Sequence, residues 1–390
     1  MFRSLAGVNY RIWFAGALIS NIGAWMQRTA QDWYVLTELT DNDAVAVGIT
    51  MALQFGPALV IGPYAGILAD RIPGRRLLAG TQITLAILAL GLGLIIVTGV
   101  AELWMVYLFA LGLGITTAID APARQTFVGE LVGVKDLPNA VALNSASFNT
   151  ARLIGPAVAG LLTVLIGAGW VIVVNAFTFL AMLLALYLLR ENQLHPMKKD
   201  KKSRGQFREG LAYVKRRSDL MVIFAIVFLM GTFGFNFAIF TATMASVEFD
   251  RGAGEFGLMS SVIAVGSVTG ALLSARRDRP RLRVIVGAAL GFSATMVIAA
   301  LMPTFELFTA SLAPVGFFAL TMITSANAYV QTTTRPAIRG RVMSLYLMIF
   351  MGGTPIGGPL LGLIANELGA RWAIGVGAVA GVIAAIVAIA

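Results

Sequence analysis

Three ionisable side chains stand inside long apolar stretches of this sequence and could carry chemistry there. Arg28 and Asp32 are four residues apart, so a helix would place them on one face, and Arg152 lies in a later apolar stretch. Charges inside the hydrocarbon of a membrane are costly and are candidates for function by default. A carboxylate near a guanidinium can gain or lose a proton when its surroundings change. We therefore predict that Asp32 exchanges a proton and that Arg28 or Arg152 controls how readily it does so.

The alternative for these side chains is purely structural. Arg28 and Arg152 fall at comparable depths in their stretches, whereas Asp32 lies one turn further along, at a rise of about 1.5 Å per residue. Arg28 and Asp32 could then form a fixed ion pair at the outer end of a helix without exchanging a proton. Both interpretations require a helix that crosses a membrane.

The composition indicates that membrane. Of the 390 residues, 58% are hydrophobic and only 12% are charged, which is far too apolar for a soluble domain. The net charge of +10 does not indicate nucleic acid, because the basic residues occur in short clusters between apolar stretches. Clusters of this kind orient helices in a bilayer.

The predicted fold class is an all-α membrane protein with twelve transmembrane helices, at about 20 apolar residues per crossing. The predicted spans are residues 11–38, 45–69, 76–99, 102–122, 138–167, 169–190, 219–246, 254–275, 282–303, 305–333, 338–366 and 371–390. Outside the spans, lysines and arginines fall on the side that holds the N-terminus, with Arg251 and Arg371 as the exceptions. The positive-inside rule then predicts a multi-pass protein of the cytoplasmic (inner) membrane with both termini in the cytoplasm.

A long polar segment separates two sets of six predicted spans. The predicted domains are an N-terminal six-helix bundle over residues 1–190, a basic cytoplasmic linker over 191–218 and a C-terminal six-helix bundle over 219–390. Within the linker, Phe207, Leu211 and Val214 would share one face of a helix that is otherwise basic. This pattern favours an amphipathic helix that lies on anionic lipid headgroups.

Two glycine motifs recur at an offset of about 204 residues, which indicates duplicated halves related as parallel repeats. The motif at residues 62–66 matches Gly266-x-x-x-Gly270, and the Gly-Pro pair at 155–156 matches the pair at 358–359. Ser274 stands where Asp70 would recur. Small residues let helices approach closely, and proline bends them. The residues predicted to pack helices together are Gly62, Gly66, Gly155, Pro156, Gly160, Gly358 and Pro359.

Three motifs resemble those of a known family. Residues 66–76 read Gly-Ile-Leu-Ala-Asp-Arg-Ile-Pro-Gly-Arg-Arg, similar to the major facilitator superfamily signature Gly-x-Leu-Ala-Asp-Arg-x-Gly-Arg-Lys between its second and third helices, with one extra residue before Gly74. Residues 151–160, Ala-Arg-Leu-Ile-Gly-Pro-Ala-Val-Ala-Gly, resemble the fifth-helix signature of that superfamily's antiporters. Residues 120–124, Asp-Ala-Pro-Ala-Arg, and 137–140, Leu-Pro-Asn-Ala, look like the branch of macrolide and tetracycline efflux proteins and enterobactin-type siderophore exporters.

The resemblance implies two pseudo-symmetric six-helix bundles that alternate the access to a central cavity, in which Arg28, Asp32 and Arg152 would meet water. It also implies a cytoplasmic latch formed by Asp70, Arg71, Arg75 and Asp120. In that latch Asp70 would approach the N-terminal end of a helix beginning near residue 338, and Arg75 would reach Asp120. The alternative is that these groups are solvated loop charges.

Aromatic and amide side chains within the spans bear on the cargo. A mostly apolar cavity with scattered amides suits a bulky amphipathic compound better than a sugar. The residues predicted to line it are Trp25, Gln54, Phe55, Asn144, Phe148, Phe233, Asn236, Phe237, Asn327 and Gln331. The same side chains could instead pack against other helices or face lipid.

The sequence thus predicts a secondary active transporter that exports amphipathic, drug-like compounds, driven by proton entry. The alternatives are export of an anionic metabolite or siderophore, which Arg28 and Arg152 would contact, and an uncoupled lipid or solute translocator. There is no cysteine, no Walker motif, and a single histidine, His195, in a charged loop. We therefore expect no enzyme activity, metal or cofactor. The expected partners are a small substrate, protons and the bilayer, without nucleic acid, and we expect a monomer.

Overall fold

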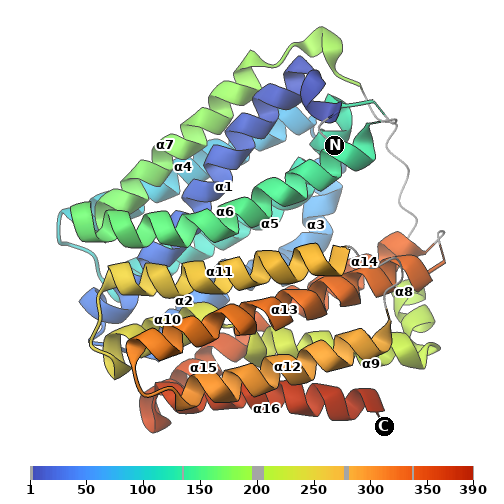
Figure 1. The fold of residues 1–390 in the computed structure, drawn as a ribbon. Coiled ribbons are helices and arrows are strands. Elements are labelled where there is room, and N and C mark those ends of the chain that lie inside the picture. The colour runs from blue at the N-terminus through green and yellow to red at the C-terminus, as the bar shows by residue number, and fades with distance from the viewer. Residues whose placement is uncertain (1–2, 134–135, 196–205, 276–280, 336–337, 390) are drawn as a thin grey trace. The chain divides into compact units, whose positions relative to one another are not determined.

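The computed structural model describes residues 3–133, 136–195, 206–275, 281–335 and 338–389. Within these ranges every regular element is a helix and no strand occurs, which confirms the predicted all-α fold (Figure 1). The chain divides into two compact units. Unit 1 comprises residues 1–39 and 56–200, and unit 2 comprises residues 40–55 and 201–390.

The helices of unit 1 are η1 (Arg3–Ala6), α1 (Val8–Tyr34), η2 (Val35–Leu39), α3 (Pro57–Arg71), α4 (Gly74–Val97), α5 (Leu103–Leu131), α6 (Leu137–Ile166), α7 (Ala168–Leu188) and η3 (Glu191–Gln193). Those of unit 2 are α2 (Ala44–Phe55), α8 (Gln206–Lys215), α9 (Ser218–Leu229), η4 (Met230–Gly234), α10 (Phe237–Thr243), η5 (Met244–Glu248), α11 (Ala253–Ala275), α12 (Leu282–Leu301), α13 (Phe305–Thr333), α14 (Arg339–Gly352), α15 (Thr354–Leu368) and α16 (Ala370–Ile389).

Eleven helical segments in the described part of the chain are long and apolar enough to cross a membrane. They correspond to all the predicted spans except the first. That first span is α1, whose 27 residues are long enough to cross but include several buried polar side chains. Those side chains are Asn9, Ser20, Gln27, Thr29, Gln31 and Asp32. The one predicted span that falls outside these eleven segments therefore contains most of the candidate chemistry.

Several predicted spans are built from two helices, and the breaks follow from sequence. α2 and α3 meet at Gly56, directly before Pro57, and α14 and α15 meet at Gly353, shortly before Pro355. Proline is favoured in the first turn of a helix, where its missing N–H is not needed. A third break, at Phe235 and Asn236, separates η4 from α10.

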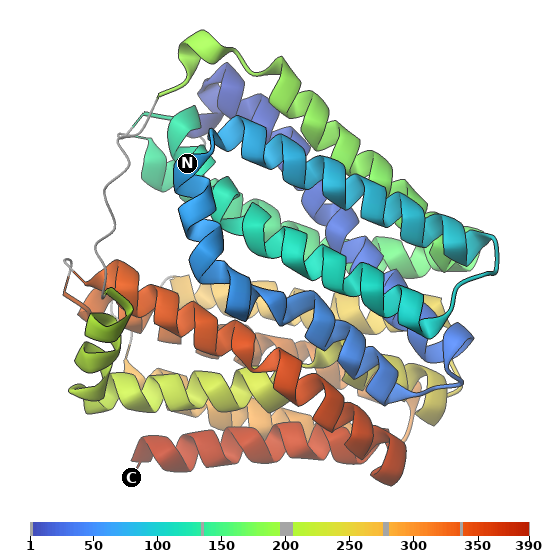
Figure 2. The same ribbon diagram turned by 180° about the vertical axis from the view of Figure 1, so that it is seen from behind.

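In unit 1, α1 packs against both α6 and α7, α4 contacts α5 and α7, and α3 contacts α5 (Figures 1 and 2). At one end of this unit the rings of Trp13 and Phe127 lie 5.2 Å apart, and the Tyr10 hydroxyl donates to the Ala140 carbonyl at 2.8 Å. These contacts join α1, α5 and α6 into one apolar core.

In unit 2, α13 packs against α11 and α12, and α16 packs against α12, α9 and α15. The crossing of α11 and α13 is very close. A Cβ atom at Gly266 would overlap the Ala313 carbonyl, and one at Gly270 would overlap that of Phe317. The predicted small-residue packing is thus present in the second copy of the motif.

α2 precedes the linker but packs in unit 2, against α15. The backbones of Gly48 and Gly358 are in contact, and a side chain at Gly362 would overlap Ala44. The Asn366 amide donates to the Asp43 carboxylate at 2.6 Å. The two compact units therefore differ from the predicted domains over residues 40–55, and the linker boundaries stay a prediction.

The amphipathic helix predicted in the linker forms, as α8, and it packs against α14. Glu209 pairs with Arg341 of α14, and Val214 is buried. Leu211 remains exposed, while the side chain of Phe207 lies outside the described residues. Directly after α8, hydrogen bonds to Asp219 raise the pKa of Arg217 above its ordinary value. Contact of α8 with headgroups stays a prediction.

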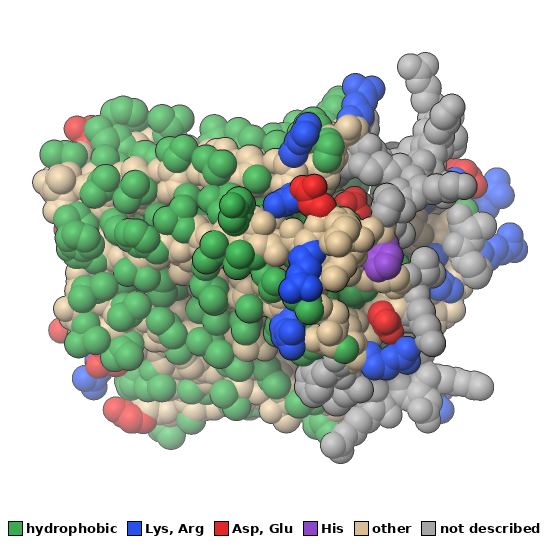
Figure 3. Space-filling view, turned by 90° about the horizontal axis from the view of Figure 1, so that it is seen from above, with side chains coloured by type: hydrophobic (Ala, Val, Ile, Leu, Met, Phe, Trp, Pro, Cys, Tyr) green, Lys and Arg blue, Asp and Glu red, His purple; other side chains and the backbone are tan. Residues whose placement is uncertain are grey.

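The surface agrees with a membrane environment. In Figure 3, hydrophobic side chains cover most of the visible helix surface, and Lys and Arg side chains gather toward one end. Exposed large apolar residues occur along many helices, including Leu161 and Leu165 on α6 and Phe177 and Leu184 on α7. In water such an apolar surface would favour aggregation, whereas in a membrane it is the surface expected to contact lipid.

Candidate functional site

The candidate site in unit 1 depends on how closely α6 and α7 approach α1. A Cβ atom at Gly155 of α6 would lie 2.6 Å from the Trp25 Cβ atom, so only glycine fits there. On the α7 side, side chains at Gly16 and Gly23 would overlap Ala185 and Thr178. These glycines hold α1 against both neighbours and fix the position of the residues that follow.

Trp25 is the centre of the cluster. The guanidinium carbon of Arg28 lies 5.4 Å from the centre of the Trp25 ring, and that of Arg152 lies 5.5 Å from it. Both distances are within the range of cation–π attraction. Phe148 of α6 packs its ring edge-to-face with Trp25 at 5.7 Å. Two of the predicted proton-coupling residues and two predicted cavity residues therefore meet at one indole ring.

Asp32 lies one turn beyond Arg28 on α1. Its side chain is buried, with 5% of the residue exposed, and its Oδ1 atom has no hydrogen-bond partner among the described residues. The neighbouring Gln31 is fully buried and neither of its amide atoms is partnered there either. By contrast, Gln27 accepts a hydrogen bond from Asn175 of α7 at 2.6 Å. The polar atoms that lack a hydrogen-bond partner therefore belong to Asp32 and to the residue next to it.

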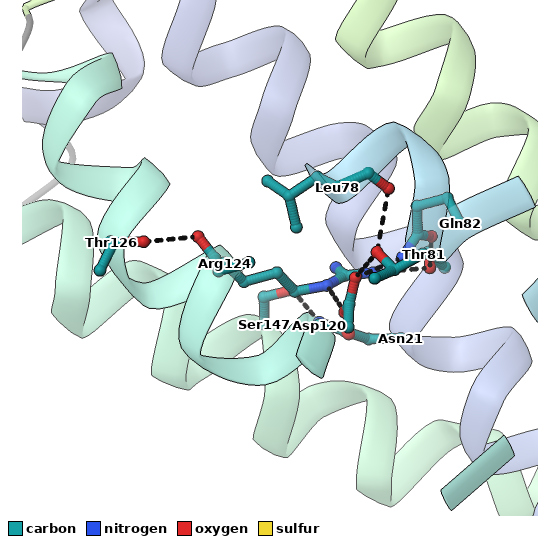
Figure 4. Close-up of polar contacts among 10 residues, drawn as sticks. Asn21, Leu78, Thr81, Gln82, Asp120, Arg124, Thr126 and Ser147 are labelled. Atoms are coloured by element: carbon teal, nitrogen blue, oxygen red, sulfur yellow. Dashed lines mark hydrogen bonds and ion pairs between the residues drawn. The ribbon is translucent and has the colours of Figure 1, made fainter. Parts of the chain in front are cut away.

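A second polar cluster in unit 1 joins α1, α4 and α5 (Figure 4). Asp120 Oδ1 accepts hydrogen bonds from Thr81 at 2.6 Å and from Gln82 at 2.8 Å. Its Oδ2 pairs with Arg124, one turn further along α5. Arg124 also donates to the Ser20 hydroxyl of α1 at 3.3 Å. We call these five residues the Asp120 cluster.

Of the residues predicted for the cytoplasmic latch, Arg75 and Asp120 each have other partners. Arg75 bonds to the end of α7, where it donates to the Leu186 and Tyr187 carbonyls, and it pairs with Glu191. The predicted contact between Arg75 and Asp120 is wrong for this conformation, because nearer donors on α4 and α5 satisfy Asp120. Arg71 is exposed at the end of α3, and the Asp70 side chain lies outside the described residues.

The predicted packing residues differ in how closely other helices approach them. Gly155 and Gly358 are in tight contacts, and Pro156, Gly160 and Pro359 lie in α6 and α15 beside them. Gly62 differs, because a side chain there would meet nothing within 4 Å. The described residues thus show no close helix approach at Gly62, and the approach predicted there stays a prediction. The surroundings of Gly66 lie outside the described residues.

In unit 2, Asn236 stands in the break between η4 and α10. It is fully buried, its amide nitrogen donates to the Thr232 carbonyl at 2.7 Å, and its Oδ1 atom has no partner among the described residues. At the repeat offset of about 204 residues, Asn236 corresponds to Asp32 and Thr232 to Arg28. The second repeat therefore has a neutral pair where the first has a charged one.

The other predicted cavity residues are scattered. Asn144 lies on α6 in unit 1, whereas Gln54, Phe55, Phe233, Phe237, Asn327 and Gln331 lie in unit 2. Gln331 donates to Asn327 at 2.6 Å on one face of α13. Gln54 is buried, and its amide nitrogen has no hydrogen-bond partner within the described ranges.

Sequence reasoning missed two groups of residues. Ser20, Thr81, Gln82 and Arg124 complete the Asp120 cluster, and the spacing of Asp120 and Arg124 by four residues could have revealed that pair. Phe235 was also missed, although its ring lies within about 6 Å of Phe237, Phe292 and Phe350. Nothing in the sequence distinguishes Phe235 from the other apolar residues of its span.

Comparison with known proteins identifies the class. The family model described as "transmembrane secretion effector" matches residues 2–390, so the chain belongs to that family. The chain is 24% identical to the staphyloferrin A transporter of Staphylococcus aureus, covering 92% of this chain and 90% of that protein. It is 25% identical to macrolide efflux protein A of Streptococcus pyogenes, with the same coverage. It is 28% identical to the enterobactin exporter EntS of Citrobacter koseri, covering 84% and 79%.

Solved structures support the same fold. A bacterial homologue of the human lysosomal transporter Spinster, crystallised in an inward-facing conformation, has a TM-score of 0.74 and 17% identity, covering 97% of this chain and 96% of that one. The nucleoside transporter NupG has a TM-score of 0.72 and 14% identity, covering 98% of both chains. The fold is that of major facilitator transporters, as predicted, and the protein is a multi-pass membrane transporter, not an enzyme.

Proposed function

We propose that this transporter exports a small amphipathic compound from the cell and that proton exchange at Asp32 is coupled to the transport. The observation that supports coupling is the buried Asp32 carboxylate with an unpartnered oxygen, one turn from Arg28. A buried carboxylate without full hydrogen bonding is costly when it is charged. Its protonation state therefore responds to whatever enters or leaves its surroundings.

The relatives support the direction and the kind of cargo. Two of them carry export in their names, for macrolides and for enterobactin, and a third transports staphyloferrin A. The aromatic and amide side chains around Trp25 and Asn236 suit compounds of this amphipathic kind. The protein would act as a monomer in the cytoplasmic membrane, with both termini in the cytoplasm and two six-helix halves that alternate access.

Asp32→Asn tests the coupling. The full chain is reconstituted into proteoliposomes, a pH gradient is imposed, and both the movement of a radiolabelled macrolide and that of protons are measured. We expect Asp32→Asn to lose gradient-driven accumulation and cargo-dependent proton movement, because asparagine cannot bind the proton. Exchange of labelled for unlabelled macrolide without a gradient should continue, since it needs no net proton transfer.

Asp250→Asn is the matched control. Asp250 is exposed, and its φ of +51° is a conformation that asparagine also adopts. This variant should couple like the parent protein. If Asp32→Asn still moved protons together with the macrolide, the role of Asp32 would be rejected. If the parent protein moved neither the macrolide nor enterobactin in this assay, the cargo class would be rejected first.

A further inference from the structure

The charges around Trp25 do not balance. Arg28 and Arg152 both lie within 5.5 Å of the ring centre, and Asp32 on the same face of α1 can compensate only one positive charge. Arg28 and Asp32 are one turn apart, at the spacing at which oppositely charged residues interact on a helix. The guanidinium that needs a further anion is therefore Arg152.

Arg152 occupies the middle of α6. Among the described residues it forms neither a hydrogen bond nor an ion pair, and its guanidinium lies against the Trp25 ring. A guanidinium at membrane depth normally pairs with an acid or with backbone carbonyls, or it faces water or a ligand. Arg152 is therefore oriented by an aromatic ring, while its five N–H donors are left for another molecule.

The ring contacts give this position the character of a binding site. Trp25 contacts both the Arg152 guanidinium and the Phe148 ring, and 48% of Phe148 is exposed. Gly155 lies one turn from Arg152 and keeps α6 against Trp25, so the indole and the guanidinium are held together by the backbone. A planar cation beside exposed aromatic surface matches a molecule that carries an anionic oxygen on an aromatic or apolar body.

We propose that Arg152 and Trp25 bind the anionic group of the cargo and that the protein therefore prefers organic anions to cations. This inference rests on the proposed export function and specifies its substrate class. The chemistry required is a carboxylate, phenolate or similar oxygen anion on an apolar ring system. A lipid phosphate shares part of that chemistry, so the experiment must separate the two sources.

The test uses two probes with the same ring and opposite charge, 2-naphthoate and 2-naphthylmethylammonium. Binding of each is measured to the full chain in nanodiscs of zwitterionic phosphatidylcholine. The parent protein should bind the naphthoate more tightly. Arg152→Gln should weaken naphthoate binding by about tenfold or more, as expected for the loss of a hydrogen-bonded charge, and leave ammonium binding unchanged or tighter.

Two further variants keep the outcome interpretable. Arg152→Lys keeps the charge but loses the planar fork, so it should bind naphthoate with intermediate affinity and also covers the case in which the glutamine variant does not fold. Arg251→Gln is the matched control, because Arg251 lies 5.5 Å from the Phe305 ring at an exposed position in unit 2. The control should bind both probes like the parent protein.

Three results would overturn the proposal. The first is naphthoate binding that is unchanged in Arg152→Gln, and the second is a parent protein that prefers the ammonium probe. The third is loss of naphthoate binding when phosphatidylglycerol is added to the nanodiscs, which would identify a lipid phosphate as the occupant. Proton coupling is measured separately in proteoliposomes, so a failure at Asp32 would leave the preference for anions standing, and the reverse also holds.

Discussion

At the scale of single residues, unit 1 contains two buried aspartates that differ in how they are satisfied. Asp120 accepts hydrogen bonds from Thr81 and Gln82 and pairs with Arg124. Asp32 has an oxygen without a partner in the described chain. A carboxylate with several donors is stable as an anion, whereas one with an open oxygen depends on its surroundings. We infer that Asp120 stabilises the helix bundle and that Asp32 exchanges a proton when its surroundings change.

Asp120→Ala should therefore destabilise unit 1 strongly. The Arg124 side chain is only 13% exposed, so the variant would leave a buried charge without its partner, at a cost of about 3–5 kcal/mol. Thermal unfolding in detergent measures the effect. Glu191→Ala is the comparison, because its pair with Arg75 is exposed and should matter little. Equal thermal stability of the two variants would mean that Asp120 does not contribute to the stability of unit 1.

Contacts of single residues could be predicted from the sequence when both partners lie on one helix, and not when they lie on different helices. That Arg28 and Asp32 share one face of α1 follows from a spacing of four residues. Contact of Arg152 with Trp25 does not, because it requires α6 to approach α1 at Gly155. Arg75 illustrates the opposite failure, since carbonyls at the end of α7 compete for it and no periodicity shows where that end lies.

At the scale of helices, the two copies of the small-residue motif have different surroundings. Gly266 lies against the backbone of α13, whereas no described atom lies within 4 Å of a side chain placed at Gly62. A sequence motif states that a close approach is permitted, and only a facing helix makes it occur. For this reason the helices and their order were predictable from apolar length, while their contacts were not.

Gly266→Ala and Gly62→Ala form a matched pair that tests this difference. Gly266→Ala should force α11 and α13 apart and cost about 1–3 kcal/mol, as overpacking does. Gly62→Ala should be neutral or stabilising by up to about 1 kcal/mol, because alanine favours a helix. The unfolding midpoints of both variants are compared with that of the parent protein in the same detergent. A Gly266→Ala protein as stable as the parent would contradict the close crossing of α11 and α13.

At the scale of the whole molecule, the distribution of basic residues predicts the orientation in the membrane. The sequence contains no cysteine, so a single introduced cysteine can be labelled without background. Val100, 58% exposed between α4 and α5, should lie outside the cell, and the exposed Arg216 after α8 should lie inside.

Val100→Cys should react with a membrane-impermeant maleimide in intact cells. Arg216→Cys should react only after the cells are permeabilised, because the positive-inside rule places its basic cluster in the cytoplasm. Both variants should label equally in detergent, which controls for accessibility of the thiol. The reverse pattern in intact cells would show that the orientation is inverted.

The placement of α2 has a consequence for dividing the protein into pieces. Gly48 of α2 rests on Gly358 of α15, although a cut between residues 200 and 201 would assign them to different polypeptides. The carboxyl-terminal piece made alone would expose the glycine surface of α15. The amino-terminal piece would contain α2 without the helix that α2 packs against. Neither piece would therefore be expected to fold fully by itself, whereas a continuous chain always supplies α2 and α15 together.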